Sequence, residues 1–262
     1  MIKCKICNTK TVKLKFLTIN SISHVNFNEF SKPSYYKCKN CNIIENKNVK
    51  NIFSTNYYYN LNQSDLYIYR NNLKTKKSDF QSKFIFNNLK IKKKNLILDF
   101  GCNKGDLLKS FKKIYNIKNL FGYEINNNFV SLLKKNKIKF DDFYKSNQKF
   151  DIIIFSHSLF YVKNLKKLFL SLRQKLNKNG KIYIETPDIM QNPIYSVVGD
   201  QAYFFTKKNA INLFNYFNFD VIYKKVPFTD NFCLIAKKST KAFIKFKFKD
   251  NSFEKSLIML NK

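Results

Sequence analysis

The sequence of 262 residues contains no tryptophan, five glycines, four prolines and two histidines, and its only arginines are Arg70 and Arg173. Arginine recognises phosphates and base edges best, because its planar guanidinium forms paired hydrogen bonds. Its scarcity argues against interpreting the net charge of +32 as a nucleic-acid-binding surface. The abundant residues Lys, Asn, Ile, Phe and Tyr share A/T-rich codons, and the lysines are spread along the whole chain. Nucleotide bias in the gene therefore explains the charge.

Long hydrophobic runs are missing as well. No stretch of about 18 apolar residues is present to cross a membrane, and the N-terminus lacks the apolar segment of a signal peptide. We therefore expect a cytoplasmic protein, in which six cysteines suggest metal binding rather than disulfides. The hydrophobic content of 44% indicates a folded chain, long enough for one α/β domain and a small appendage.

Four cysteines form two C-x-x-C pairs near the N-terminus: Cys4 with Cys7, and Cys38 with Cys41. Each pair can present two thiolates to one side of a tetrahedral ion, and four soft ligands suit structural zinc. Apolar residues between the pairs, from 12 to 19, favour short strands, so we predict a zinc-ribbon-like domain over residues 1–50. His24 is predicted to be a surface residue, because four cysteines complete the ligand shell. A redox motif or a chance pairing is the alternative.

A strand, a tight turn and a helix are predicted in succession from residue 95 to residue 114. Apolar residues 96–98 lead into Asp99, and Gly101 and Gly105 bracket a turn before apolar residues recur at helical spacing. Glycine lets the backbone approach a ligand closely, and the helix that follows offers unpaired N–H groups to an anion. The turn is therefore the main candidate for a ligand site, although other doubly wound proteins also contain such turns.

Strands and helices alternate through the rest of the chain. Strands are predicted at residues 96–99, 120–124, 138–140, 150–155, 181–186, 221–224 and 232–236. Helices are predicted near residues 129–133, 165–176 and 210–217. This alternation implies a Rossmann-like, doubly wound α/β sheet of seven strands, whose ligands bind beyond the carboxyl ends of the strands. We expect Asn179 and Gly180 to turn into the fifth strand, and the last two strands to form an antiparallel hairpin at the sheet edge.

The remaining segments connect or flank these domains. Residues 51–90 are predicted to be a linker with a helix over residues 65–89 that covers the sheet or closes over a cofactor. One tyrosine of the triplet at 57–59 is a candidate to line an acceptor pocket, although packing is the simpler role. Residues 91–240 form the main domain, and the tail at 241–262 alternates Phe and Lys as an edge strand does.

The glycine turn resembles motif I of the class I S-adenosylmethionine (SAM) methyltransferases, D-x-G-x-G-x-G. Asn103 replaces the middle glycine, and Asn tolerates a left-handed backbone better than most residues. Residues 150–162 resemble the family's F-D-x-x-x-x-x-H-x-L-E-H-V, with Phe160 and Tyr161 in place of the E-H pair. Residues 179–188 are similar to P-G-G-x-L-x-I-E-T-P-N.

A fourth stretch, Tyr203-Phe-Phe-Thr206 followed by a helix and residues 219–221, resembles the family's Y-F-T…G-F-x-V, with Gln201 where many relatives have His. The resemblance implies methyl transfer from SAM, and it implies these cofactor-binding residues: Asp99, Gly101, Cys102, Asn103, Gly105, Glu124, Asp142 and Ser156.

Three carboxylates have specific expected roles. Glu is rare in this chain, so Glu124 at the end of the second strand is a candidate to accept the ribose hydroxyls. Asp141 or Asp142 ends the third strand, where an acid accepts an adenine amino group, and we prefer Asp142. Asp99 is expected to orient the turn and the methionine amino group rather than to act as a base.

His157 directly follows the fourth strand and matches the histidine of the family motif. Histidine has a reference pKa near neutrality, which suits a general base that removes a proton from the methyl acceptor. The alternative is a histidine that only packs or bonds backbone around the cofactor.

A zinc-binding segment ahead of such a domain resembles the sugar C-methyltransferases that act on nucleotide-linked sugars. They usually carry a further C-terminal domain, whereas only a short segment follows the last strand here. The resemblance implies methylation of a small molecule, with a sugar of surface-polysaccharide assembly as the acceptor. The alternatives are an RNA methyltransferase that grips RNA with the ribbon and its lysines, and a non-catalytic SAM-binding protein. The acceptor atom and the oligomeric state are left open.

Overall fold

A computed structural model describes the following residues of the chain: 2–14, 34–49, 59–60, 66–70, 73–192, 201–227 and 229–241. The predictions for His24, for Tyr57 and Tyr58, and for the tail beyond Lys241 lie outside these residues. Two compact units divide the chain: Met1–Lys50 with His157–Arg173 and Ile184–Lys262, and Asn51–Ser156 with Gln174–Tyr183. Within the described residues, no helix combines the length and the apolar character that crossing a membrane requires.

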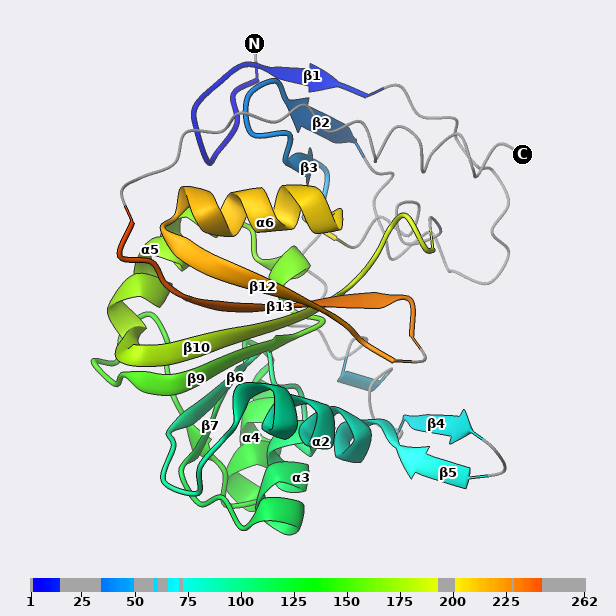
Figure 1. The fold of residues 1–262 in the computed structure, drawn as a ribbon, viewed down its shortest axis with the longest axis vertical. Coiled ribbons are helices and arrows are strands. Elements are labelled where there is room, and N and C mark those ends of the chain that lie inside the picture. Colours follow the sequence, from blue (N-terminus) through cyan, green and yellow to red (C-terminus); the bar gives the residue numbers. More distant parts are fainter. Residues whose placement is uncertain are drawn as a thin grey trace. The chain divides into compact units, whose positions relative to one another are not determined.

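A seven-stranded sheet has the strand order β12-β13-β10-β9-β6-β7-β8 (Figure 1). Its strands are β6 (Ile97–Phe100), β7 (Leu120–Tyr123), β8 (Lys139–Phe140), β9 (Phe150–Ser156), β10 (Leu176–Pro187), β12 (Phe219–Lys225) and β13 (Asn231–Lys238). β6 pairs in parallel with both β7 and β9, so the strand order reverses at β6. β12 lies at the edge and pairs with β13 in an antiparallel hairpin. The predicted fold class is confirmed.

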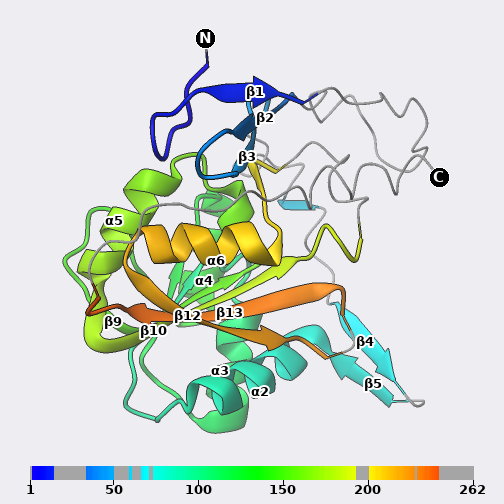
Figure 2. The same cartoon turned by 45° about the horizontal axis from the view of Figure 1, so that its top comes forward.

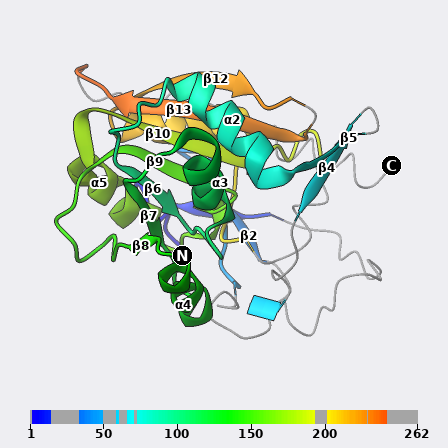
Figure 3. The same cartoon turned by 90° about the horizontal axis from the view of Figure 1, so that it is seen from below.

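Helices α2 (Lys77–Leu89), α3 (Asp106–Tyr115) and α4 (Asn127–Lys135) belong to the second unit. In α3, Leu107, Leu108 and Phe111 are buried, as expected from their spacing along one helix face. α2 lies beside α3 (Figure 3), and Ser110 of α3 donates a hydrogen bond to Asp79 of α2 at 2.6 Å. α2 therefore packs onto the helix that follows the glycine turn.

The prediction of one helix over residues 65–89 was wrong in its first half. Strands β4 (Tyr67–Arg70) and β5 (Leu73–Lys76) form an antiparallel hairpin there, and the helix begins only at Lys77 (Figure 2). Tyr, Ile and Thr favour strands because their bulky side chains pack well on a pleated surface. The Lys74 ammonium lies 4.2 Å from the centre of the Tyr67 ring, across the hairpin.

The fifth strand also differs from the prediction. β10 extends from Leu176 to Pro187, five residues longer at its start than expected. A Cβ atom added to Gly180 would lie 2.7 Å from Cγ of Leu176. Because four residues of extended strand span roughly 13 Å, this contact shows that the chain bends between Leu176 and Gly180, where the turn was expected.

Helix α6 (Lys207–Tyr216) lies over the β12–β13 hairpin in Figures 1 and 2. Thr206 starts it with a capping box, in which its hydroxyl accepts from the N–H of Asn209 and the Asn209 side chain accepts in return. Phenylalanine side chains form the core between this helix and its neighbours. The ring of Phe169 in α5 (Leu165–Lys175) lies 4.7 Å from that of Phe214 and 4.6 Å from that of Phe217.

A second sheet has the antiparallel order β1-β2-β3-β11. The strands are β1 (Thr11–Lys13), β2 (Tyr35–Cys38), β3 (Ile44–Asn46) and β11 (Tyr203–Phe204). The first three lie around the two C-x-x-C pairs. The fourth comes from the segment directly before α6, so the small N-terminal sheet includes a strand from much later in the chain.

Candidate functional site

The turn after β6 has the left-handed backbone that the motif predicts. φ is 75° at Gly101, 53° at Asn103 and 78° at Gly105. The N–H groups of Gly101 and Cys102 donate to the carbonyl oxygen of Tyr123 at 2.8 and 3.2 Å. These bonds hold the turn against the end of β7. Asn103 thus adopts the conformation of the glycine that it replaces.

Gly105 is also constrained by its neighbours. A Cβ atom there would lie 2.7 Å from Leu133 and 2.8 Å from Ile138. We expect Gly105→Ala to lower the free energy of unfolding by about 2–4 kcal/mol, because a left-handed alanine and overpacking each cost roughly 1–3 kcal/mol. Asn103→Gly, at another left-handed site of the turn, should change it by less than about 1 kcal/mol. Urea denaturation measures both, and equal stability of the two variants would contradict the packing argument.

The carboxylate of Glu124 fastens the turn to the chain after β7. Its Oε2 accepts from the N–H of Asn103 at 2.9 Å, and its Oε1 accepts from Ile125 at 2.7 Å and Asn126 at 3.0 Å. Burial raises the pKa of Glu124, while these hydrogen bonds oppose the rise. A carboxylate can accept roughly four hydrogen bonds, and that of Glu124 accepts three here. Oε2 can therefore accept one more from a ligand.

Asp99 lies in β6, next to the turn, and is only 3% exposed. Burial, and secondly the charge of Glu124, raises the pKa of Asp99 to about 7. Its Oδ1 is buried and has no hydrogen-bond partner among the described residues. A buried carboxylate oxygen without a donor is costly, and a bound cationic group would relieve that cost. This buried acceptor oxygen therefore fits the positively charged ammonium group of a methionine moiety.

Cys102 and Ser156 make protein contacts that the sequence does not show. The Cys102 thiol packs so closely on β7 that a Cβ atom on Gly122 would lie 2.6 Å from its sulfur. Burial, followed by Asp99 and Glu124, raises the pKa of Cys102 well above its usual value, so the thiol is unreactive. The Ser156 hydroxyl accepts from Gln81 of α2 at 3.1 Å. Sequence analysis missed Gln81, because a polar helix residue carries no local signal of function.

The two acids after β8 differ in their surroundings. Asp142, the preferred residue, is part-exposed and pairs with Lys145 at 3.4 Å. Asp141 is buried, and its Oδ2 accepts from the Ser146 hydroxyl at 2.6 Å. Its Oδ1 has no hydrogen-bond partner within the described part of the chain. The geometry therefore favours Asp141 over Asp142 as a group that receives a ligand donor.

His157 belongs to a cluster of three polar side chains in the first unit. Its Nε2 lies 3.3 Å from Oε1 of Glu185 and 3.2 Å from Nδ2 of Asn231. Asn231 donates to the same Oε1 at 2.9 Å, and the Glu185 side chain is 2% exposed. Sequence analysis did not single out Glu185 or Asn231. The scarcity of Glu was the available signal for Glu185.

The four cysteines of the C-x-x-C pairs come together in the first unit. Their sulfur atoms all lie within 4.8 Å of one another. The distance is 3.6 Å from Cys4 to Cys41 and 3.4 Å from Cys7 to Cys38. Sulfurs around a tetrahedral zinc with bonds of about 2.3 Å are roughly 3.8 Å apart. The donor set therefore fits a closed tetrahedral metal site.

The turns that carry the two pairs have the same geometry. A backbone N–H donates to a sulfur at 3.4 Å in each turn: Ile6 to Cys4, and Asn40 to Cys38. The residue after each pair is left-handed, with φ of 59° at Asn8 and 56° at Asn42. Hydrogen bonds among the four thiols lower the pKa of Cys7 and Cys38 and raise that of Cys4 and Cys41.

One family model, described as a methyltransferase domain, matches residues 69–228. The chain belongs to this methyltransferase family. The match covers the glycine turn, Glu124, His157 and the first strand of the terminal hairpin. The enzyme is thus a SAM-dependent methyltransferase, as the motifs implied. The comparison with curated proteins gives no match.

Solved structures share the fold of this methyltransferase at low identity. A chain of the complex between the Haloferax volcanii Trm112 methyltransferase activator and a methyltransferase has a TM-score of 0.53 and 11% identity, covering 63% of this chain and 91% of that one. A SAM-dependent methyltransferase from Archaeoglobus fulgidus has a TM-score of 0.50 and 16% identity, covering 62% and 94%. The glycopeptide N-methyltransferase MtfA, complexed with sinefungin, has a TM-score of 0.50 and 11% identity, and the match covers 62% of this chain and 94% of that one. These likenesses concern the fold alone.

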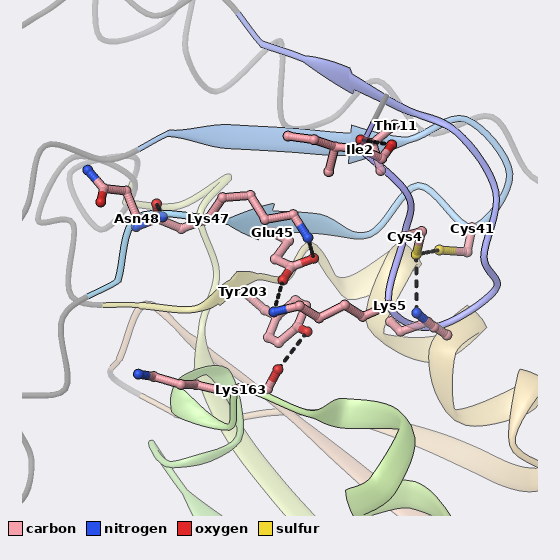
Figure 4. A network of polar contacts seen from close by, with 12 residues as sticks. Ile2, Cys4, Lys5, Thr11, Cys41, Glu45, Lys47, Asn48, Lys163 and Tyr203 are labelled. Carbon is pink, nitrogen blue, oxygen red and sulfur yellow. Dashed lines mark hydrogen bonds and ion pairs between the residues drawn. The ribbon is translucent and has the colours of Figure 1, made fainter.

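A buried acid links the cysteine turns of this methyltransferase to β11. Glu45 in β3 forms ion pairs with Lys5, at 2.7 Å, and with Lys47 (Figure 4). Tyr203 lies opposite Glu45 in the antiparallel pair β3–β11, and its hydroxyl donates to the carbonyl oxygen of Lys163 at 3.2 Å. Burial, and secondly Glu45, raises the pKa of Tyr203. The small sheet and the segment before α6 therefore share one polar network.

Proposed function

We propose that this methyltransferase acts in the cytoplasm on a small-molecule acceptor, and that a nucleotide-linked sugar of surface-polysaccharide assembly is the acceptor class that the motifs favour. Asp99 supports the use of SAM most strongly, because its buried carboxylate has an oxygen without a donor beside the glycine turn. A cationic ammonium group satisfies such an oxygen. When bound, SAM supplies a methyl group on a positively charged sulfur that is ready for nucleophilic attack.

Residues in and around the glycine turn contact different parts of SAM. Asp99 takes the methionine ammonium, and the backbone of residues 101–105 approaches the cofactor closely, because three of its residues have positive φ. Oε2 of Glu124 accepts one ribose hydroxyl, since its other acceptor positions are used by backbone N–H groups. Asp141 accepts the adenine amino group in place of Asp142, because its free oxygen is buried.

His157 is the proposed general base. A hydroxyl or an enolisable carbon must lose a proton as it takes the methyl group, and an imidazole can accept that proton. The larger part of the acceleration comes from alignment of the acceptor and exclusion of water. The left-handed Asn103, which preserves the turn, supports an active enzyme over a chain that has lost its ligand.

The cysteine cluster is proposed to hold a structural zinc ion within a ribbon over residues 1–50. Four thiolates complete a tetrahedral shell and leave no open position for catalysis. Residues 51–90 connect this ribbon to the methyltransferase domain at 91–240, and a basic tail follows at 241–262. RNA is the less favoured acceptor. Arg173, one of the two arginines, donates to the carbonyl oxygens of Phe217 and Asn218 after α6, which is a structural role.

Calorimetric titration with S-adenosylhomocysteine, the demethylated product of SAM, tests the cofactor site. We expect wild-type binding with a dissociation constant of about 1–100 μM, and a loss of at least ~100-fold in Glu124→Ala, because that variant removes a ribose contact and releases the turn. Asp142→Ala is the matched control at an exposed acid and should bind as the wild type does.

Circular dichroism must show that each variant is folded. Absence of binding by the folded wild-type protein would refute the proposed use of SAM. A large loss in Asp142→Ala would show that Asp142, and not Asp141, contacts the adenine.

A further inference from the structure

His157 has a strained backbone that contacts with Glu185 hold in place. Its φ is 56°, although it is not a glycine, and side chains with a Cβ atom rarely adopt this conformation. Its N–H donates to the carbonyl oxygen of Glu185 at 2.9 Å, while its ring nitrogen Nε2 lies 3.3 Å from the carboxylate of the same residue. Strain of this kind persists where the surroundings determine the conformation, and it is concentrated at functional sites.

The contact between Nε2 and Glu185 decides which ring nitrogen carries the proton. A carboxylate can only accept, so Nε2 must carry the hydrogen if the contact is to be attractive. The other arrangement would place a nitrogen lone pair against a buried carboxylate oxygen at 3.3 Å. In the neutral ring, a proton on Nε2 leaves the lone pair on Nδ1.

Asn231 contacts both the carboxylate and the ring. Its amide nitrogen, which can only donate, lies 2.9 Å from Oε1 of Glu185 and 3.2 Å from Nε2 of His157, and the second contact is a hydrogen bond only if Nε2 carries no proton. The shorter contact, to a charged oxygen, is the stronger one, so the amide chiefly orients the carboxylate. With the proton on Nε2, Oε1 receives one donor from β13 and one from the residue after β9, and this fixes its position. The Glu185 side chain is 2% exposed, so donors from the protein must replace the water that it has lost.

We propose that Glu185 and Asn231 are positioning residues that hold His157 with its proton on Nε2, so that Nδ1 is the atom that accepts a proton from the methyl acceptor. This rests on the proposed role of His157 as general base. As the proton moves from the acceptor to Nδ1, the electron pair of the acceptor forms the bond to the methyl carbon, and the sulfonium sulfur keeps the pair of the broken carbon–sulfur bond. The imidazolium that results has a proton on each nitrogen, and its charge lies beside that of Glu185.

Nuclear magnetic resonance of the ring nitrogens tests this proposal without any acceptor. The chain has only two histidines, so the full-length protein labelled with ¹⁵N-histidine gives two ring systems, and a His24→Gln variant assigns them. At a pH where the ring is neutral, we expect His157 in the wild type to be mainly the Nε2–H tautomer. A mainly Nδ1–H ring in the wild type would overturn the proposal.

Two variants show whether the named residues set this preference. Glu185→Gln should raise the Nδ1–H population at least severalfold, because the glutamine side chain can donate to Nε2 as well as accept from it. Asn231→Ala removes one of the two donors to Oε1 and also the amide that could donate to an unprotonated Nε2, so it should change the population less than Glu185→Gln does. Asp230→Asn is the control, because it makes the same acid-to-amide change at the exposed residue next to Asn231. Unchanged tautomers in Glu185→Gln would overturn the proposal.

The same samples separate this inference from the proposed function. All variants should bind S-adenosylhomocysteine as the wild type does, because none of the three residues is assigned to the cofactor. A wild type that fails to bind it, while the tautomer still depends on Glu185, would refute the use of SAM and leave the positioning intact. Once an acceptor is found, Glu185→Gln should lower kcat by about 10–100-fold with KM unchanged. An unchanged kcat would show that Nδ1 does not accept the proton in the reaction.

Discussion

Removal of the proposed zinc ion is expected to unfold the small sheet and to release β11 from it. The four sulfurs are held together by two short turns and three short strands. Their buried apolar side chains, among the described residues and besides the cysteines, are Ile6, Tyr35, Ile43 and Ile44. Binding of a structural zinc ion contributes roughly 10–16 kcal/mol in comparable small domains. Since Tyr203 and Phe204 pair with Glu45 and Ile44, we expect the loss of order to extend to β11.

Three measurements check this expectation. Native mass spectrometry should find one zinc per chain in the wild type and none in Cys41→Ser. Hydrogen exchange should show that the N–H groups of β3 and β11 lose at least ~100-fold of their protection in that variant or after chelation, as expected when they open without the rest of the fold. Cys233→Ala is the control, because this buried cysteine in β13 lies outside the cluster.

Zinc retained by Cys41→Ser would refute the proposed ligand set. Full protection of β11 in the metal-free protein would show that β11 is held by the contacts before α6 alone, such as the bond from Tyr203 to Lys163.

Asp99→Asn is expected to stabilise the ligand-free protein and to weaken its binding of S-adenosylhomocysteine. The pKa of Asp99 is raised from 3.8 to about 7, so the folded state holds a proton that the unfolded state has lost between these values. Stability therefore falls as the pH rises from about 4 to about 7, and above pH 7 the cost is complete. A shift of this size corresponds to at most about 4 kcal/mol.

Thermal unfolding between pH 5 and pH 8 measures the first effect. At pH 8 we expect Asp99→Asn to be more stable by about 2–4 kcal/mol, which raises Tm by roughly 5–15 °C in a protein of this size. At pH 5 the difference should be about a third of this, because only about a third of the pH range over which stability falls has then been crossed. Asp220→Asn, at a less buried acid on β12, should leave Tm unchanged at both pH values.

Calorimetry measures the second effect. The amide cannot pair with the ligand's ammonium as a charged group does, so we expect about 10–100-fold weaker binding at pH 8. In the wild type, affinity should increase as the pH rises through 7, since Asp99 ionises there. A variant that is less stable than the wild type at pH 8, or that binds equally well, would contradict the role given to Asp99.

Local patterns in the sequence predicted most of the strands and helices of the methyltransferase domain. Apolar residues such as 150–155 formed a buried parallel strand, and Leu107, Leu108 and Phe111 formed the buried face of α3. The conformation of Asn103 was also predictable, because the backbone preferences of a residue depend on its own Cβ and side chain. The C-x-x-C spacing predicted the two cysteine turns, whereas the two pairs meet each other across 31 and 37 residues.

Other features depended on contacts between distant segments. Residues 67–76 became a hairpin rather than the start of a helix, because strand preference is realised only when a partner strand is present. The preference between Asp141 and Asp142 follows from burial, which adjacent acids in a sequence do not reveal. The hydrogen bond from Gln81 to Ser156 likewise depends on tertiary packing, because 75 residues separate the two in the sequence.

The sequence by itself determined the α/β class, the glycine turn, the cysteine pairs and the histidine after the fourth strand, because each of these is encoded by residues close together in the chain. Only the tertiary structure brought Asn231 to Glu185 and His157, across 46 and 74 residues, and paired β11 with β3. Hydrogen bonds between side chains on separate strands depend on sheet order and register. Long-range pairing sets both, and no local pattern specifies it.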